Sequence, residues 1–213
     1  MENHKLGKIY AKLFNAFGPQ HWWPGETPFE VAVGAVLTQN TNWGNVERAI
    51  NNLKKARALD PFKIYRMSNE RLAKLIKPSG YYNIKAERLK AFIRFLVEDY
   101  QGSMERMKKE ETALLREKLL AVKGIGPETA DSILLYALGK PVFVIDAYTK
   151  RVLSRHDILR ADEPYSKYQE KFHKALIKDI KMFNEYHALL VKLGKDYCKP
   201  KPVCGECPLR ADF

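Results

Sequence analysis

The 213-residue chain is poor in cysteine, in acidic residues and in long apolar runs, and each shortage excludes a class of protein. All three cysteines fall within the last sixteen residues, so a disulfide framework is not expected, whereas a metal site is plausible. No run approaches the roughly 20 apolar residues that span a bilayer. The N-terminus also lacks the layout of a signal peptide. We therefore expect a cytoplasmic protein with no membrane partner.

The charge balance is strongly basic. Lys and Arg number 37 against 25 Asp and Glu, which gives a formal net charge of +12. An excess of this size favours a polyanionic partner, because neutralising phosphates releases condensed counterions. Many basic proteins never bind nucleic acid, however, so the charge shifts the odds without identifying the partner.

Apolar residues recur at helical spacing along most of the chain. Spacings of three and four link the apolar side chains of residues 6–17 and 89–100, and residues 28–37 are apolar nearly all round, as in a buried central helix. Proline and glycine clusters separate these segments. Residues 142–145 are β-branched and aromatic, but too short and isolated to predict a sheet. We expect an all-α fold of about ten short helices in two lobes with a central cleft.

A Gly-Ile-Gly hairpin lies between two of the predicted helices. Its glycines permit backbone angles and a close approach that a side chain would block, and Pro127 suits the first position of the second helix. Backbone amides at such a point form an anion site that reads no sequence. The alternative is an ordinary packing corner between helices. With the basic charge, we favour phosphate contacts from Lys123, Gly124, Ile125 and Gly126.

Four separated segments of the chain carry a resemblance to one family. Residues 120–155 resemble the helix–hairpin–helix DNA glycosylases of the endonuclease III branch. Residues 37–41 are similar to the family's segment that carries a wedge into the duplex. Residues 76–86 are similar to its second DNA-facing loop, and residues 187–207 to its C-terminal helix and cluster loop. The four matches stand in the family's order, which makes chance a poor explanation.

The resemblance implies an architecture and a partner. A six-helix lobe would span residues 25–140, and a second lobe would combine residues 1–24 with 141–213. The partner would be double-stranded damaged DNA, with the target base flipped into the cleft. A monomer is the default for a cleft enzyme that acts on a duplex.

Two acidic residues determine the expected chemistry. Asp146 matches the aspartate that the family shares, and a carboxylate there would stabilise the oxocarbenium-like sugar left when the base departs. Asp146 also suits a helix N-cap. Bifunctional members carry a Schiff-base lysine at the position of Glu128, and a carboxylate cannot form an imine. The resemblance thus predicts a monofunctional enzyme that uses water, although another lysine such as Lys123 stays open as a substitute.

Other residues are candidates for extruding and holding the base. Gln39 is the expected wedge, with Asn40 as its substitute, and the alternative for Gln39 is a buried amide that satisfies loop carbonyls. Tyr81 would press against the orphaned partner base. Lys85, in the same loop segment as Tyr81, is expected to contact DNA.

The three tryptophans of the chain lie near the wedge segment in sequence. Electron-rich rings attract a cationic base by roughly 0.5–2 kcal/mol, which suits an alkylated purine; the alternative is that they fill the interface between lobes. With no Schiff-base lysine, the chain resembles the subgroup that excises 3-methyladenine. An endonuclease III-like glycosylase/lyase acting on oxidised pyrimidines, and a non-catalytic DNA-binding module, are the two alternatives. The residues of the expected base pocket are Trp22, Trp23, Pro24 and Trp43.

The cysteines of the C-terminus form an incomplete ligand set. Family members hold a [4Fe–4S] cluster through four cysteines, but this chain has only Cys198, Cys204 and Cys207, with Phe213 where the fourth would stand. Asp212 or the terminal carboxylate offers a substitute ligand, and zinc on three sulfurs is another alternative. A metal-free loop is the third. The chemistry of base removal needs no cofactor.

Overall fold

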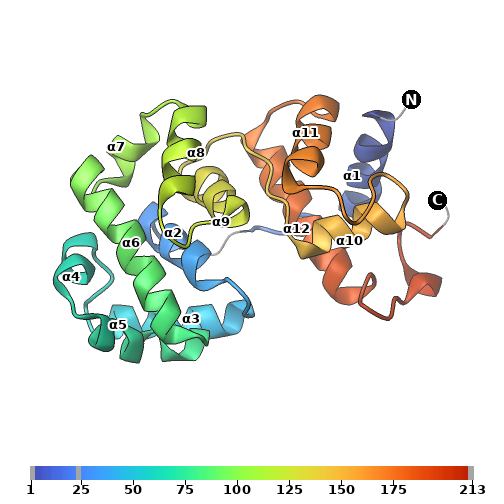
Figure 1. Ribbon diagram of the computed structural model, residues 1–213. Helices are drawn as coiled ribbons and strands as arrows, with labels where there is room; N and C mark the ends of the chain where they lie inside the picture. The colour runs from blue at the N-terminus through green and yellow to red at the C-terminus, as the bar shows by residue number, and fades with distance from the viewer. Residues whose placement is uncertain (1–2, 23–24, 211–213) are drawn as a thin grey trace. The chain divides into compact units, whose positions relative to one another are not determined.

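The computed structural model describes residues 3–22 and 25–210, which form helices joined by loops (Figure 1). These residues contain no β-strand, which confirms the predicted all-α class, and residues 142–145 are an extended connection. The chain divides into two compact units. Unit 1 combines Met1–Trp23 with Pro141–Phe213, and unit 2 is Pro24–Lys140.

Unit 2 is organised around helix α2 (Pro28–Leu37), whose residues 30–37 are all buried. Helices α3, α6 and α9 and the π-helical segment η2 pack against it. In Figure 1, the long helix α6 extends from α7 towards α5. The other elements are α3 (Trp43–Lys55), α4 (Pro61–Arg66), α5 (Asn69–Leu75), η1 (Lys77–Ser79), α6 (Tyr82–Tyr100), α7 (Met104–Lys108), α8 (Thr112–Ala121), α9 (Pro127–Ser132) and η2 (Ile133–Ala137).

Side-chain caps fix where many of these helices begin. A side-chain oxygen that accepts a backbone N–H of the first turn satisfies a donor that has no partner within the helix. Proline occupies the first turn of α2, α4 and α9, where its missing N–H costs nothing. The capping residues of α2, α3, α4, α5, α7 and α8 are Thr27, Asn42, Asp60, Ser68, Ser103 and Glu111.

Unit 1 is formed by α1 (Asn3–Phe17), α10 (Ala147–Arg155), α11 (Tyr165–Ala175) and α12 (Ile180–Asp196). Helix α12 packs on α10 and on α1. Aromatic rings fill the core: Phe143 stacks on Phe172 at 3.7 Å between centroids and meets Tyr186 edge-on. The Tyr186 hydroxyl donates to the carbonyl of Leu6 at 2.8 Å, which joins α12 to α1. This core supports the extended segment that leads to Asp146.

Candidate active site

The predicted hairpin lies between α8 and α9 in unit 2. Gly124 has φ = +86°, a conformation that L side chains rarely adopt, and Gly126 precedes Pro127, the first residue of α9. Ile125 is buried and anchors the turn, whereas the Lys123 side chain is 86% exposed and lies 3.9 Å from a Glu87 carboxylate oxygen. The hairpin therefore presents backbone and one lysine to the surface.

The expected wedge, Gln39, rests on this hairpin. Its amide nitrogen donates to the carbonyl of Gly124 at 3.1 Å and to the hydroxyl of Thr129 at 2.9 Å. The Arg88 guanidinium donates to its amide oxygen. The neighbouring Asn40 is exposed with φ = +52°, a region where asparagine is enriched. Gln39 thus stands at the hairpin and donates to a loop carbonyl, but its side chain is half-buried rather than buried, so the wedge role stays a prediction.

The second expected loop places Tyr81 and Lys85 differently. Tyr81 is 70% exposed with φ = +45° at the start of α6, so its ring is free to meet a large surface. Lys85 is only 1% exposed and its ammonium donates to the carbonyls of Leu37 and Ser79. Burial, with Arg88 nearby, lowers the pKa of Lys85 to about 8. The predicted DNA contact of Lys85 was wrong, because the side chain points inward to two backbone oxygens.

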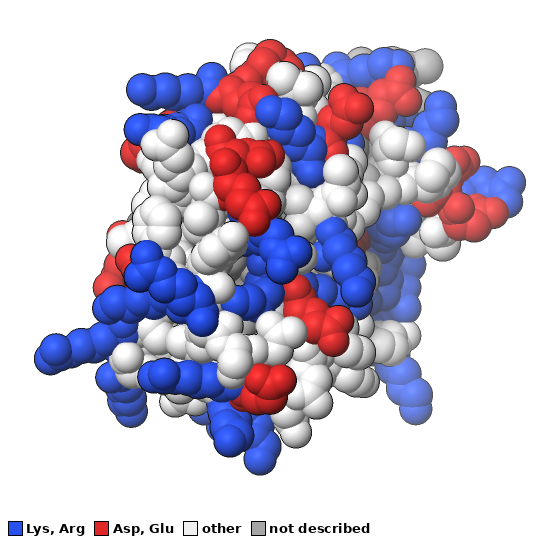
Figure 2. Space-filling view, turned by 60° about the vertical axis from the view of Figure 1, so that its left-hand side comes forward, with Lys and Arg blue, Asp and Glu red and all other residues white. Residues whose placement is uncertain are grey.

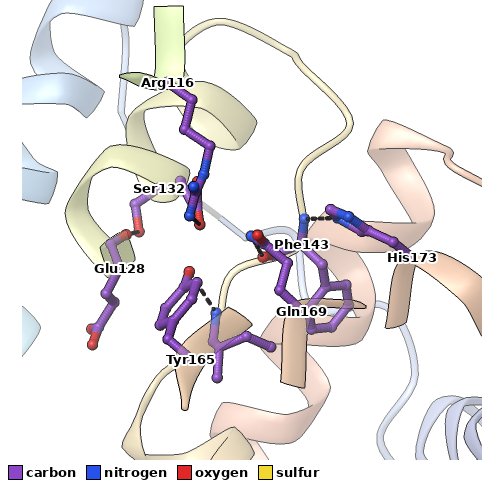
Figure 3. Close-up of polar contacts among 9 residues, drawn as sticks. Arg116, Glu128, Ser132, Phe143, Tyr165, Gln169 and His173 are labelled. Carbon is purple, nitrogen blue, oxygen red and sulfur yellow. Dashed lines mark hydrogen bonds and ion pairs between the residues drawn. The ribbon is translucent and has the colours of Figure 1, made fainter. Parts of the chain in front are cut away.

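Glu128 occupies the first turn of α9 and is exposed, as expected from the sequence. Its carbonyl accepts from the Ser132 hydroxyl at 2.7 Å (Figure 3). Arg116 of α8 makes two hydrogen bonds, 2.6 and 3.0 Å, to the fully buried carboxylate of Asp131 in α9. No pattern in the sequence marked this pair, whose bidentate geometry fixes the two hairpin helices against each other.

Asp146 ends the extended segment of unit 1 and caps α10. One carboxylate oxygen accepts the Thr149 N–H at 2.7 Å, and the other lies 3.5 Å from Nε2 of His187 in α12. Its side chain is 12% exposed. Burial acts to raise the pKa of Asp146, but the His187 charge and the bonds from His187 and Thr149 outweigh it, so the pKa is lowered. The result is a carboxylate that stays ionised while keeping an exposed edge.

Helix α11 holds the segment before Asp146 in place. The Phe143 N–H donates to Nε2 of His173 at 3.0 Å, and the Gln169 amide donates to the Phe143 carbonyl at 2.8 Å (Figure 3). The Ile145 N–H donates to the hydroxyl of Tyr165 at 3.2 Å. These side chains satisfy backbone groups that an isolated extended strand leaves unpaired. Nothing in the sequence pattern singled them out, because the pairing is formed only in the tertiary structure.

The tryptophans of the expected base pocket belong to both units. Trp43 lies in unit 2 with its ring 3.4 Å from the position of a Cβ at Gly34, so glycine lets α2 and α3 approach closely. Trp22 lies in unit 1, where the Lys195 ammonium stands 5.5 Å from the ring centroid. The ring of Trp22 therefore already attracts a cation. Trp23 and Pro24 lie outside the described residues.

Two arginines of α10 contact Cys198, the first of the three C-terminal cysteines. Arg151 donates to the Cys198 carbonyl at 2.6 Å, and Arg155 donates to the Cys198 sulfur at 3.4 Å. Cys198 and Cys207 are buried and Cys204 is exposed. Across residues 3–22 and 25–210, no three Cys, His, Asp or Glu side chains gather as they would around a metal ion. Burial, with Cys198 and Cys204 nearby, raises the pKa of the Cys207 thiol, and Phe213 lies outside the described residues.

Comparison with known proteins places this geometry in a family. Residues 33–178 match the HhH-GPD superfamily of base excision DNA repair proteins. The chain is 50% identical over 205 residues, 95% of its length and 93% of the relative's, to a Methanocaldococcus jannaschii protein named "Putative DNA repair glycosylase". It is 32% identical over 192 residues to an endonuclease III of Thermotoga maritima, covering 86% of this chain and 81% of that one.

Solved structures agree with this assignment. A Helicobacter pylori 3-methyladenine DNA glycosylase bound to 1,N6-ethenoadenine has a TM-score of 0.77 and 32% identity, over 91% of this chain and 97% of its own. A non-covalent endonuclease III–DNA complex has a TM-score of 0.83 at 22% identity, over 97% of this chain and 92% of that one, which shows the shared fold. No helix within the described ranges is long and apolar enough to cross a membrane. The chain belongs to the HhH-GPD superfamily of base excision DNA repair proteins and is a DNA glycosylase of that family.

Proposed function

We propose that the chain is a monofunctional DNA N-glycosylase that removes alkylated purines such as 3-methyladenine. The observation that carries the proposal is Glu128, an exposed carboxylate in the first turn of α9 where bifunctional relatives carry their Schiff-base lysine. The 32% identity to a 3-methyladenine glycosylase supports the choice of base. We further propose that it works as a monomer on damaged duplex DNA in the cytoplasm.

In the proposed reaction, water is the nucleophile. The bond between C1′ and the base nitrogen breaks, the electron pair leaves with the base, and a cationic alkylated purine departs neutral. Water forms the new C1′–O bond and releases its proton to solvent, which leaves an abasic site. Asp146 faces the positive charge that develops on the sugar. Its lowered pKa suits this electrostatic role better than general base catalysis, which favours a pKa near the working pH.

Binding of the damaged base is assigned to the aromatic side chains. We propose that the cation-attracting face of Trp22, where Lys195 now stands, contributes to selection of a positively charged base. Trp43, Trp23 and Pro24 stay proposed members of the pocket. Phosphate contacts come from Lys123 and the amides of the Gly124–Gly126 turn, with Gln39 as the wedge, Asn40 beside it and Tyr81 opposite. No metal takes part in the reaction as proposed.

The proposal is tested with two labelled duplexes, one methylated and one carrying an oxidised pyrimidine. Each is incubated with the protein and then analysed with and without alkali treatment. We expect release of methylated base, strand breaks only after alkali, and no covalent product with borohydride. Nicking of the oxidised-pyrimidine duplex without alkali would instead favour a glycosylase/lyase in which another lysine replaces the one absent at Glu128. A Glu128→Lys variant is the matched comparison, because trapping restored by that change locates the missing nucleophile.

A further inference from the structure

The buried lysine of helix α6 has an unusual set of partners. Lys85 is 1% exposed, and its ammonium donates to the Leu37 carbonyl at 2.8 Å and to the Ser79 carbonyl at 2.6 Å. Within the described part of the chain, backbone carbonyl oxygens bind this ammonium and no carboxylate does. Removing a cation from water is costly without a counter-charge. The buried ammonium of Lys85 therefore indicates a role beyond filling space in the core.

The two carbonyls belong to the segments that face DNA in the proposed function. Leu37 is the last residue of α2 and stands two positions before Gln39. Ser79 is the last residue of η1 and stands two positions before Tyr81. One ammonium therefore joins the start of the wedge segment to the start of the second loop, although Leu37 and Ser79 are 42 positions apart in the sequence.

The next turn of α6 supports the same region. Arg88, three residues after Lys85, donates to the side-chain oxygen of Gln39. The aliphatic part of Arg88 also lies against the hairpin, because a Cβ built on Gly124 would come within 2.3 Å of its Cγ. The start of α6 thus contacts both loops and the hairpin. A shift of this helix relative to α2 would displace all three.

We propose that Lys85 is a positioning residue that sets the spacing between the Gln39 segment and the Tyr81 segment, so that both enter the duplex at one base pair. This inference rests on the proposed wedge roles of Gln39 and Tyr81. Extrusion of a base needs one side chain to fill the vacated space and another to hold the orphaned partner. Their separation therefore has to match the geometry of the duplex, and the lysine stem with its two hydrogen bonds holds that separation.

The same helix offers a matched control. Lys90 donates to the carbonyls of Ile64, Tyr65 and Met67 at 3.1, 2.6 and 2.8 Å. Its chemistry repeats that of Lys85, since a lysine ammonium of α6 again binds backbone carbonyls. It holds the end of α4, however, and neither of the two DNA-facing segments. Removing Lys90 therefore removes a lysine that binds backbone carbonyls without disturbing the wedge, and the thermal midpoints account for its lesser burial.

The test uses a duplex with a tetrahydrofuran abasic analogue opposite 2-aminopurine, whose fluorescence reports stacking of the orphaned base. Lys85→Met and Lys90→Met are compared with the unaltered protein at saturating protein, with the thermal midpoint of each measured. We expect Lys85→Met to lose most of the fluorescence change, because the two segments would no longer enter the duplex at one base pair and the orphaned base would keep its stacking. Lys90→Met should keep the full change.

Equal fluorescence changes for Lys85→Met and Lys90→Met would overturn the proposal. If Lys85→Met does not fold, Lys85→Arg decides the question, because arginine keeps the cation and its donors but changes the length and shape of the stem. An unchanged fluorescence signal in a folded Lys85→Arg protein would again contradict the spacing role. The abasic analogue requires no base removal. Failure to release alkylated purine would thus refute the proposed substrate separately, while the fluorescence still decides the role of Lys85.

Discussion

At the scale of single residues, Asp146 has two separable tasks. Its carboxylate caps α10 through the Thr149 N–H and presents an ionised edge for the sugar in the proposed reaction. Asparagine caps a helix about as well as aspartate, whereas alanine does not. Substitution by each therefore distinguishes a capping residue from a catalytic one.

We expect Asp146→Asn to lower kcat by about 100- to 1000-fold, the usual effect of removing one electrostatic stabiliser. The thermal midpoint should fall less than in Asp146→Ala, because the cap is retained and only the charge that faces His187 is lost. Asp146→Ala should lose the activity and also about 1 kcal/mol of stability. Single-turnover base release and thermal unfolding are the measurements. Near-normal base release by Asp146→Asn would reduce Asp146 to a helix cap.

The pH dependence follows from the partners of Asp146. Because its folded pKa is lowered, the carboxylate stabilises the fold above its unfolded pKa of about 3.9, and this contribution is lost as the pH falls through the folded value. Replacing His187 by Gln removes the main influence that lowers the pKa of Asp146 against the raising effect of burial. The acid limb of kcat/KM should then move to higher pH, as a pH–rate profile would show. An unmoved limb would mean that His187 does not set the ionisation of Asp146.

At the scale of elements, the hairpin was predictable and its supports were not. The glycine pair, Pro127 and the flanking apolar stripes sufficed to predict two helices joined by a tight turn, because these are local preferences. The sequence suggested a regular second helix, but residues 133–137 form a π-helical segment. The Arg116–Asp131 pair joins α8 to α9 over 15 residues, and such charges read as surface residues until the fold buries them.

Gly124→Ala tests whether the hairpin requires its left-handed glycine. The substitution meets φ = +86° and a Cβ position 2.3 Å from the Arg88 Cγ, so we expect a loss of about 1–3 kcal/mol of unfolding free energy. Gly126→Ala is the control, because its Cβ would have no neighbour within 4 Å and its φ is −91°. Urea unfolding compares them. Equal stability of the two variants would show that Arg88 and the loop relax freely.

At the scale of the whole molecule, the composition predicted the kind of partner, but the sequence did not predict where each charged side chain lies. The net charge of +12 indicated a polyanionic partner, and Lys and Arg are dense over the lower part of the face in Figure 2. The sequence nevertheless placed Lys85 on DNA, because it lies in the segment that resembles the family's second DNA-facing loop. Its burial depends on two carbonyls that come together only when distant segments pack. Long-range pairing of this kind leaves no local pattern to recognise.

The basic charge should make DNA binding strongly salt-dependent. The logarithm of affinity falls with the logarithm of salt concentration by about 0.9 per phosphate neutralised. Lys123 is 86% exposed at the hairpin, so Lys123→Ala should weaken binding to any duplex and reduce that slope by about one. Lys63→Ala is the control, because this exposed lysine donates to the Arg57 carbonyl at α4, outside the hairpin and both loops. Affinities measured across a salt series by fluorescence anisotropy give the slope for each variant. Equal slopes for the two variants would show that Lys123 does not contact the phosphate backbone. The hairpin would then contact phosphate through its turn amides alone.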